Sequence, residues 1–128
     1  MNEGKENIIV KKSYAFALEI VSLYKYLVEK KEFVLSKQLL RSGTSIGANI
    51  HEGVVSVSKK DFINKLGITV KEANETLYWL NLLKDSGYIE EEQFNKLNTS
   101  CEELKRILNS IILTTKERYL SNTDIHNS

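Results

Sequence analysis

The sequence predicts an all-α protein folded as an up-down-up-down four-helix bundle. Its 128 residues include no proline, whereas average usage of about 5% would supply about six, and proline breaks helix interiors. The apolar residues recur at helical spacing in four long runs, without the Asn-Gly or Asp-Gly turns that join alternating strands. Because the connections between these runs are short, consecutive helices must run antiparallel.

A chain of this length forms one domain with a core of its own. We expect residues 10–120 to form the bundle, residues 1–9 to be a flexible N-terminal segment and residues 121–128 to be a disordered tail. The single cysteine, Cys101, cannot form an internal disulfide, and the chain carries neither an apolar run of about 18 residues nor a charged-then-apolar leader. We therefore predict a soluble, cytoplasmic protein without membrane contact.

The first helix is expected over residues 10–30. Its apolar side chains form two stripes that together cover more than half of its circumference. One stripe contains Tyr14, Ala17, Leu18, Val21, Tyr24 and Val28, and the other contains Phe16, Ile20, Leu23 and Leu27. A bundle core needs only one stripe, so the other is expected to lie in a subunit interface, and the sequence leaves open which face is which.

The second helix is expected over residues 36–52, capped by the Ser36 hydroxyl and closed by Gly53. Its core residues are Leu39, Gly43, Ile46 and Ile50. It also contains a run of small residues, comprising Gly43, Ser45, Gly47 and Ala48. Each glycine costs about 1 kcal/mol of helix stability relative to alanine, so we predict a close approach there by another helix, within the bundle or across a subunit boundary. The alternative is a surface where a partner's backbone comes near.

The third helix has the sharpest start signal in the chain. Ser58 and Asp61 occupy a capping box flanked by Val57 and Phe62 as a hydrophobic staple, so the helix begins directly after Ser58 and stops at Gly87. Its core residues are Phe62, Leu66, Val70, Ala73, Leu77 and Leu80. Three further apolar residues, Ile68, Trp79 and Leu83, lie outside that stripe.

The predicted oligomer interface combines these three residues with one apolar stripe of the first helix, because a monomer would leave both exposed. It comprises Phe16, Ile20, Leu23, Leu27, Ile68, Trp79 and Leu83.

The fourth helix is expected from about residue 90 to residue 120. Its first three residues are glutamates, which suit the positive end of the helix dipole. The spacing of the apolar residues then alternates between three and four, as in the seam of a bundle helix. The seam consists of Phe94, Leu97, Cys101, Leu104, Leu108, Ile111 and Thr115.

No pattern in the chain indicates catalysis. HExxH, CxxC, a phosphate-binding loop and a nucleophile elbow are all absent. A di-iron bundle would need Glu-x-x-His pairs, but Ala48 and Thr123 stand three residues before His51 and His126. We interpret His51 as a solvated side chain and Cys101 as a small buried apolar group. The expectation is a non-enzyme with no cofactor, metal or small-molecule substrate.

Polar residues line one flank of the second helix and face acids on the third. This polar network comprises Arg41, Asn49, Glu52, Glu72 and Glu75. Because an unpaired charge beside a packed face is costly, we predict that Arg41 bridges to Glu72 or Glu75 while Asn49 bonds nearby backbone. The alternative is a polar ligand pocket. Trp79 is likewise interpreted as core or interface, with a base-stacking platform as the alternative.

Charge is balanced overall but sorted along the bundle. Eighteen Lys and Arg residues against seventeen Asp and Glu give a net charge of +1, which by itself does not suggest nucleic-acid binding. The antiparallel order, however, gathers possible nucleic-acid-binding residues at one end, namely Lys11, Lys12, Lys59, Lys60, Lys116 and Arg118. It gathers acids at the other end, including Glu29, Glu32, Asp85, Glu90, Glu91 and Glu92. A ring of aligned subunits would multiply the basic charge on one rim, and solvated surface charge is the alternative.

With these elements in place, three segments resemble a known family. They are ENIIVKKSYAFALEIVSLYKYL at residues 6–27, EFVLSKQLLRSGTSIGANIHEG at 32–53 and SKKDFINKLGITVKEANETLYWLNLLKDSGYI at 58–89. Over residues 6–112 the chain resembles the four-helix bundle family named after the protein encoded in 23S rRNA intervening sequences. The resemblance implies a left-handed bundle that assembles as a ring-shaped homopentamer. It extends to the accessory protein of diversity-generating retroelements, a pentameric barrel that binds nucleic acid and a reverse transcriptase.

Together, the residues and the resemblance predict a non-enzymatic, homo-oligomeric scaffold, expected to be a pentamer. Its expected partners are further copies of the chain and RNA or a nucleoprotein. The alternative is a protein-protein interaction adaptor without nucleic-acid contact.

Overall fold

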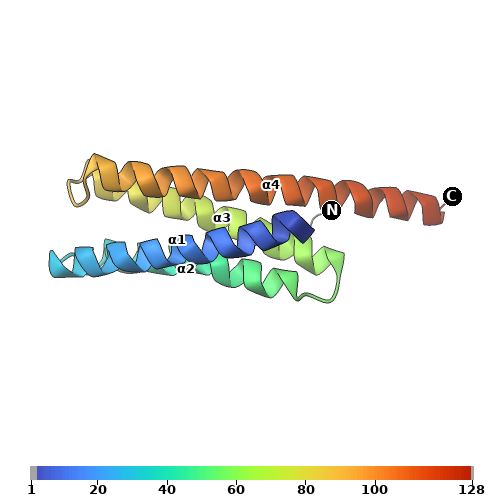
Figure 1. Cartoon of the computed structure of the whole chain (residues 1–128), viewed down its shortest axis with the longest axis horizontal. Helices are drawn as coiled ribbons and strands as arrows, with labels where there is room; N and C mark the ends of the chain where they lie inside the picture. The colour runs from blue at the N-terminus through green and yellow to red at the C-terminus, as the bar shows by residue number, and fades with distance from the viewer. Residues whose placement is uncertain (1–2, 128) are drawn as a thin grey trace.

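The computed structural model describes the backbone of residues 3–127 and the side chains of residues 4–119. It contains helices α1 (Glu3–Glu29), α2 (Leu35–Val54), α3 (Lys59–Asp85) and α4 (Glu91–Asn127). The helices alternate in direction (Figure 1), and each packs against two neighbours, in the cyclic order α1, α2, α3, α4. The predicted up-down-up-down four-helix bundle is therefore confirmed. Over the residues described, no helix is long and apolar enough to cross a membrane.

The first and the last helix of the chain, α1 and α4, are both longer than predicted. α1 begins at Glu3 instead of residue 10 because Ile9 is buried in the core, and Lys5 reaches across to Ser110 of α4 at 2.7 Å. α4 continues to Asn127 instead of ending near residue 120, and it extends past the other three helices (Figure 1). The predicted terminal segments are thus largely helical, while their residues 1, 2 and 128 lie outside the described part.

The core stripe of α1 is the one that the sequence analysis assigned to a subunit interface. The side chains of Phe16, Ile20, Leu23 and Leu27 are all buried inside the bundle, as is that of Leu83 on α3. These five residues cannot form a subunit interface, so that part of the prediction is wrong. Two residues of the predicted interface remain accessible: Ile68 is exposed, and Trp79 is half-buried against the core.

The glycines of α2 explain why α1 presents this stripe. A Cβ atom on Gly43 would lie 2.8 Å from Cγ1 of Ile20, and one on Gly47 would lie 3.3 Å from the Ser13 carbonyl oxygen. Both distances are below ordinary van der Waals contact between heavy atoms. The close approach predicted from the small residues therefore takes place within the bundle, between α1 and α2.

The seam of α4 and the start of α3 match the sequence pattern. All seven predicted seam residues of α4 are buried, including Cys101, whose thiol lies 3.5 Å from the Ala73 carbonyl. Burial raises the pKa of Cys101 to about 12, so the thiol stays protonated at neutral pH. Ser58 caps α3 by accepting a hydrogen bond from the Asp61 amide at 3.1 Å. The predicted staple is absent, however, because Val57 is 96% exposed.

Of the two helix ends that were predicted at a glycine, the end of α3 is confirmed and the end of α2 is not. Gly87 adopts a φ of 84°, and the Tyr88 amide donates to the Leu83 carbonyl at 2.9 Å, which closes α3 as predicted. At the end of α2 the prediction is wrong, because Gly53 lies inside the helix and is buried against α3. A residue other than glycine closes α1, where Lys31 adopts a φ of 66°.

The predicted cap of α2 by Ser36 is also wrong. α2 begins at Leu35, and the buried carboxylate of Glu32 accepts hydrogen bonds from the amides of Ser36 at 2.6 Å and Val34 at 3.3 Å. The Ser36 hydroxyl instead donates to the Glu32 carbonyl at 2.8 Å. Burial alone would raise the pKa of Glu32, but the hydrogen bonds from the start of α2 outweigh it and lower that pKa. An ionised carboxylate therefore holds the start of α2.

Replacing Glu32 tests this cap. At pH 7 we expect Glu32→Gln to lower the free energy of unfolding by about 0.5–2 kcal/mol, because a neutral amide is a weaker acceptor. Since the pKa of Glu32 is lower in the folded state, its contribution is complete above the ordinary Glu value of about 4.3. It is lost as the pH falls through the folded value.

Urea unfolding from pH 7 downward should therefore show a gap between the two proteins that narrows below about pH 4.3. Glu29→Gln, at an exposed position near the end of α1, is the matched control and should change little. Equal stability of wild type and Glu32→Gln at pH 7 would contradict the cap.

Candidate functional site

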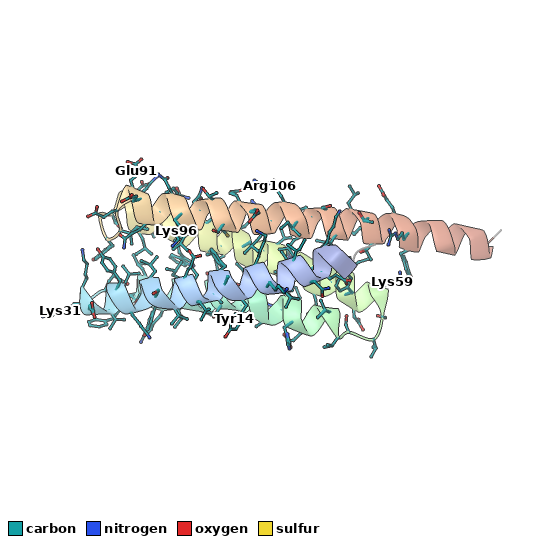
Figure 2. The ribbon with its side chains drawn as sticks, in the orientation of Figure 1. Tyr14, Lys31, Lys59, Glu91, Lys96 and Arg106 are labelled. Carbon is teal, nitrogen blue, oxygen red and sulfur yellow. The ribbon has the colours of Figure 1, made fainter. Side chains whose placement is uncertain are left out.

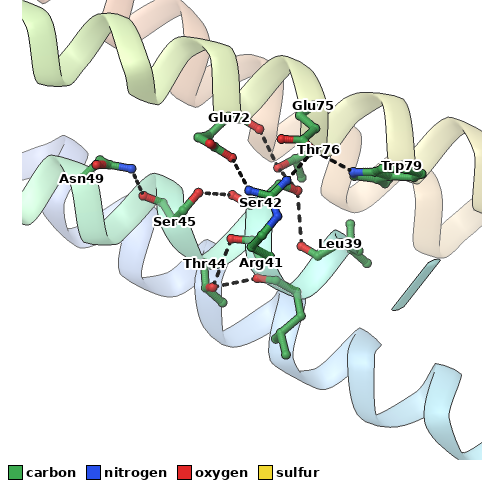
Figure 3. A network of polar contacts seen from close by, with 11 residues as sticks. Leu39, Arg41, Ser42, Thr44, Ser45, Asn49, Glu72, Glu75, Thr76 and Trp79 are labelled. Atoms are coloured by element: carbon green, nitrogen blue, oxygen red, sulfur yellow. Dashed lines mark hydrogen bonds and ion pairs between the residues drawn. The ribbon is translucent and has the colours of Figure 1, made fainter. Parts of the chain in front are cut away.

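The polar network on α2 and α3 is built around Arg41 (Figure 3). Its guanidinium lies 3.4 Å from a Glu72 carboxylate oxygen and donates a hydrogen bond to Glu75. The indole N–H of Trp79 donates to the same Glu75 oxygen at 3.4 Å. The hydrogen bond between Arg41 and Glu75 raises the pKa of the Arg41 guanidinium and lowers the pKa of the Glu75 carboxyl group. The predicted bridge is present, and it holds both acids at once.

A buried hydroxyl pair lies beneath this bridge and was missed in the sequence analysis. The hydroxyls of Thr76 and Ser42 are 2.9 Å apart, and the Thr76 hydroxyl lies 2.8 Å from the Glu72 carbonyl. Both side chains are fully buried. A threonine three residues after the core residue Ala73 was the available signal, since that spacing returns to the same helix face.

Asn49 and Glu52, the other two members of the predicted network, do not contact the Arg41 bridge in the described contacts. The Asn49 amide donates to the Ser45 carbonyl at 2.9 Å, as predicted for nearby backbone. Glu52 instead lies 3.6 Å from Lys65 of α3 and takes no part in the Arg41 bridge. The contacts of Arg41 and Glu52 thus join α2 to α3, while Asn49 bonds within α2. These satisfied contacts support a structural role rather than a ligand pocket.

The basic end of the bundle retains four of its six predicted residues. Lys59 and Lys60 lie in the first turn of α3, at the end where α4 leaves the bundle (Figure 2). A pocket of about 330 Å³ brings Lys60 and Lys116 together. A neighbouring pocket of about 390 Å³ brings Lys59 and Arg118 together. We call these four residues the basic end.

Lys11 and Lys12 do not belong to this cluster. Because α1 begins at Glu3, both lysines lie more than two turns from its start. Lys12 forms an ion pair with Glu103 of α4 at 3.1 Å, so its charge is largely compensated. At the opposite end, Glu32 is buried as a helix cap, while Glu90, Glu91 and Glu92 are exposed.

A groove on the outside of the bundle follows α1 and α2. Its volume is about 750 Å³, and its lining consists of Val10, Ser13, Tyr14, Ala17, Thr44, Gly47, Ala48, His51 and Glu52. On the α1 side, Tyr14 is 67% exposed. Leu18, one turn further along α1, is 56% exposed and lines a separate pocket between α1 and α4. Both residues belong to the apolar stripe of α1 that the predicted interface did not include. We call the groove along α1 and α2 the α1–α2 groove.

Among the residues described, no three His, Cys, Asp or Glu side chains are grouped so that they could hold a metal ion. Cys101 and His51 also lie apart, since Cys101 is buried in the core and His51 lines the α1–α2 groove. In the described part of the chain, the α1–α2 groove and the basic end are the two candidate functional surfaces that join a pocket to the predicted small residues or to the predicted basic residues. The pocket of about 530 Å³ between α1 and α4 contains neither set.

Comparisons with known proteins agree with the fold and the sequence pattern. Residues 5–110 match the family model of the 23S rRNA-intervening sequence protein. No curated protein matches the chain. A protein with unknown function from the S23 ribosomal protein family of Bacteroides thetaiotaomicron, known from a 1.70 Å crystal structure, is 57% identical, with a TM-score of 0.83. The match covers 84% of this chain and 97% of that chain. The chain belongs to the 23S rRNA-intervening sequence protein family.

Proposed function

We propose that the chain is a non-enzymatic, homo-oligomeric scaffold whose subunits meet at the α1–α2 groove. The observation that carries this proposal is the apolar α1 side of the groove, which is formed by Val10, Tyr14 and Ala17 and where Tyr14 is 67% exposed. Gly47 and Ala48 line the α2 side and leave room for the backbone of an incoming helix. Exposed apolar grooves of this kind are typical of protein interaction sites.

A ring needs a second surface that differs from the groove, because head-to-tail contacts join unlike patches. One face of α3 supports this role. Ile68, Glu72, Glu75 and Trp79 are spaced by four, three and four residues and so share that face. It combines the exposed Ile68 with the satisfied Arg41 bridge and the edge of Trp79. A copy number of five is expected from the family resemblance alone.

Assembly in a ring gives the basic end its proposed role, which is to bind the phosphates of RNA, alone or in a nucleoprotein. Cyclic symmetry points all subunits the same way, so every copy of Lys59, Lys60, Lys116 and Arg118 would lie on one rim. The local positive potential then grows with copy number, although the net charge per chain is only +1. Phosphate binding by clustered cations depends on this local arrangement.

Light scattering tests the assembly. At micromolar concentration we expect a mass several times the 14.7 kDa of one chain, with five copies as the expected number. Tyr14→Glu combined with Ala48→Glu, at two exposed positions that line the groove, should dissociate the oligomer, because each buried, unpaired carboxylate costs several kcal/mol. Lys25→Glu, at an exposed position on α1, should leave the mass unchanged. A wild-type mass near 14.7 kDa would contradict the proposal.

RNA binding requires a separate measurement. We expect fluorescence anisotropy to show affinity for RNA that falls steeply with salt and that Lys59→Glu combined with Lys60→Glu abolishes. The matched control is Lys25→Glu combined with Lys37→Glu, which makes the same charge change at exposed positions near the opposite end. All three proteins should keep the same oligomer mass. Equal, negligible binding at low salt would rule out the RNA role and leave a protein-interaction adaptor.

A further inference from the structure

The smaller pocket at the basic end combines more than positive charge. It lies between the start of α3 and the part of α4 that leaves the bundle, and its volume is about 330 Å³. α3 contributes Lys60, Ile63 and Asn64, and α4 contributes Lys116 and Tyr119. Ile63 and Asn64 follow Lys60 by three and four positions, and Tyr119 follows Lys116 by three, so each set lies on one helix face. The two faces meet at this pocket.

The lining offers groups that can contact the phosphate and the base of a nucleotide. Lys60 and Lys116 are exposed ammonium groups, one from each helix, and so can contact a phosphate from both sides. Tyr119 is 44% exposed, and its ring offers a surface on which a base can stack. Asn64 adds an amide that can both donate and accept hydrogen bonds at a base edge. A free phosphate would use the lysines but neither the ring nor the amide.

We propose that this pocket holds one unpaired nucleotide of a bound RNA, with its base on the Tyr119 ring and its phosphate between Lys60 and Lys116. The inference rests on the proposed RNA binding and specifies its form. A volume of about 330 Å³ lies at the lower limit of small-ligand sites, about 300–1,000 Å³, and so suits a single nucleotide. Bases in a duplex are stacked on one another and do not offer a face to Tyr119. The basic end therefore binds single strands in preference to duplexes.

Three labelled RNAs test this inference with the full-length oligomer: a short single strand, its duplex, and the same single strand made without bases. Wild type should bind the complete single strand about tenfold more tightly than the abasic strand, since stacking on an aromatic ring contributes to that extent. It should bind the duplex about as weakly as the abasic strand. Tyr119→Leu should remove the preference for bases, and Tyr119→Phe should retain it.

Tyr78→Leu is the matched control, because Tyr78 is an exposed tyrosine elsewhere on α3. It should behave as wild type, and light scattering should show that every variant keeps its mass. Equal wild-type affinity for all three RNAs, or a preference that persists in Tyr119→Leu, would overturn the nucleotide pocket while leaving RNA binding in place. If none of the three RNAs bound, the proposed RNA function would be overturned together with the pocket.

Discussion

The close approach of α1 to α2 determines which residues of this bundle are buried and which remain on its surface. Gly43 leaves room for the branched side chain of Ile20, and Gly47 leaves room for the backbone at Ser13. Because Ile20 must face Gly43, the rotation of α1 about its own axis is set, and Phe16 and Leu23 enter the core with Ile20. The same rotation places the opposite stripe of α1 outside.

The candidate interface follows from this rotation. With Ile20 directed inward, Tyr14 is left on the surface beside the small residues of α2, and the α1–α2 groove results. The glycines therefore have two effects. Gly43 and Gly47 allow α1 to pack closely against α2. Gly47 also lines the α1–α2 groove. Core packing and the proposed assembly thus depend on the same few residues.

The sequence predicted those elements whose signals are local or strictly periodic. The α4 seam lies in the core as expected, since a single apolar stripe with spacings of three and four leaves one possible orientation. Ser58 caps α3 and Gly87 closes it, because each signal acts within a few residues. The start of α2 was predicted to within one residue, but its capping group was missed, because the cap is the carboxylate of Glu32, which directly follows a left-handed residue at Lys31.

The orientation of α1 and the extent of the basic end could be predicted only in part. α1 carries two apolar stripes, and the contact of Ile20 with Gly43, which is not visible in the pattern of α1 itself, selects one. The antiparallel order correctly placed Lys60 beside Lys116. It failed for Lys12, because α1 starts seven residues earlier than residue 10, at Glu3, and Lys12 therefore lies further along the bundle beside Glu103.

The most direct test of this account is the free energy of unfolding of Gly43→Ala, measured in urea. In a helix without steric constraint, this change should stabilise the protein by about 1 kcal/mol. We predict the opposite sign, a loss of about 1–3 kcal/mol, because the new methyl group would meet Ile20 at 2.8 Å. Gly67→Ala on α3, where nothing lies within 4 Å, should show the ordinary gain. A Gly43→Ala protein as stabilised as Gly67→Ala would contradict the claim that this contact sets the orientation of α1.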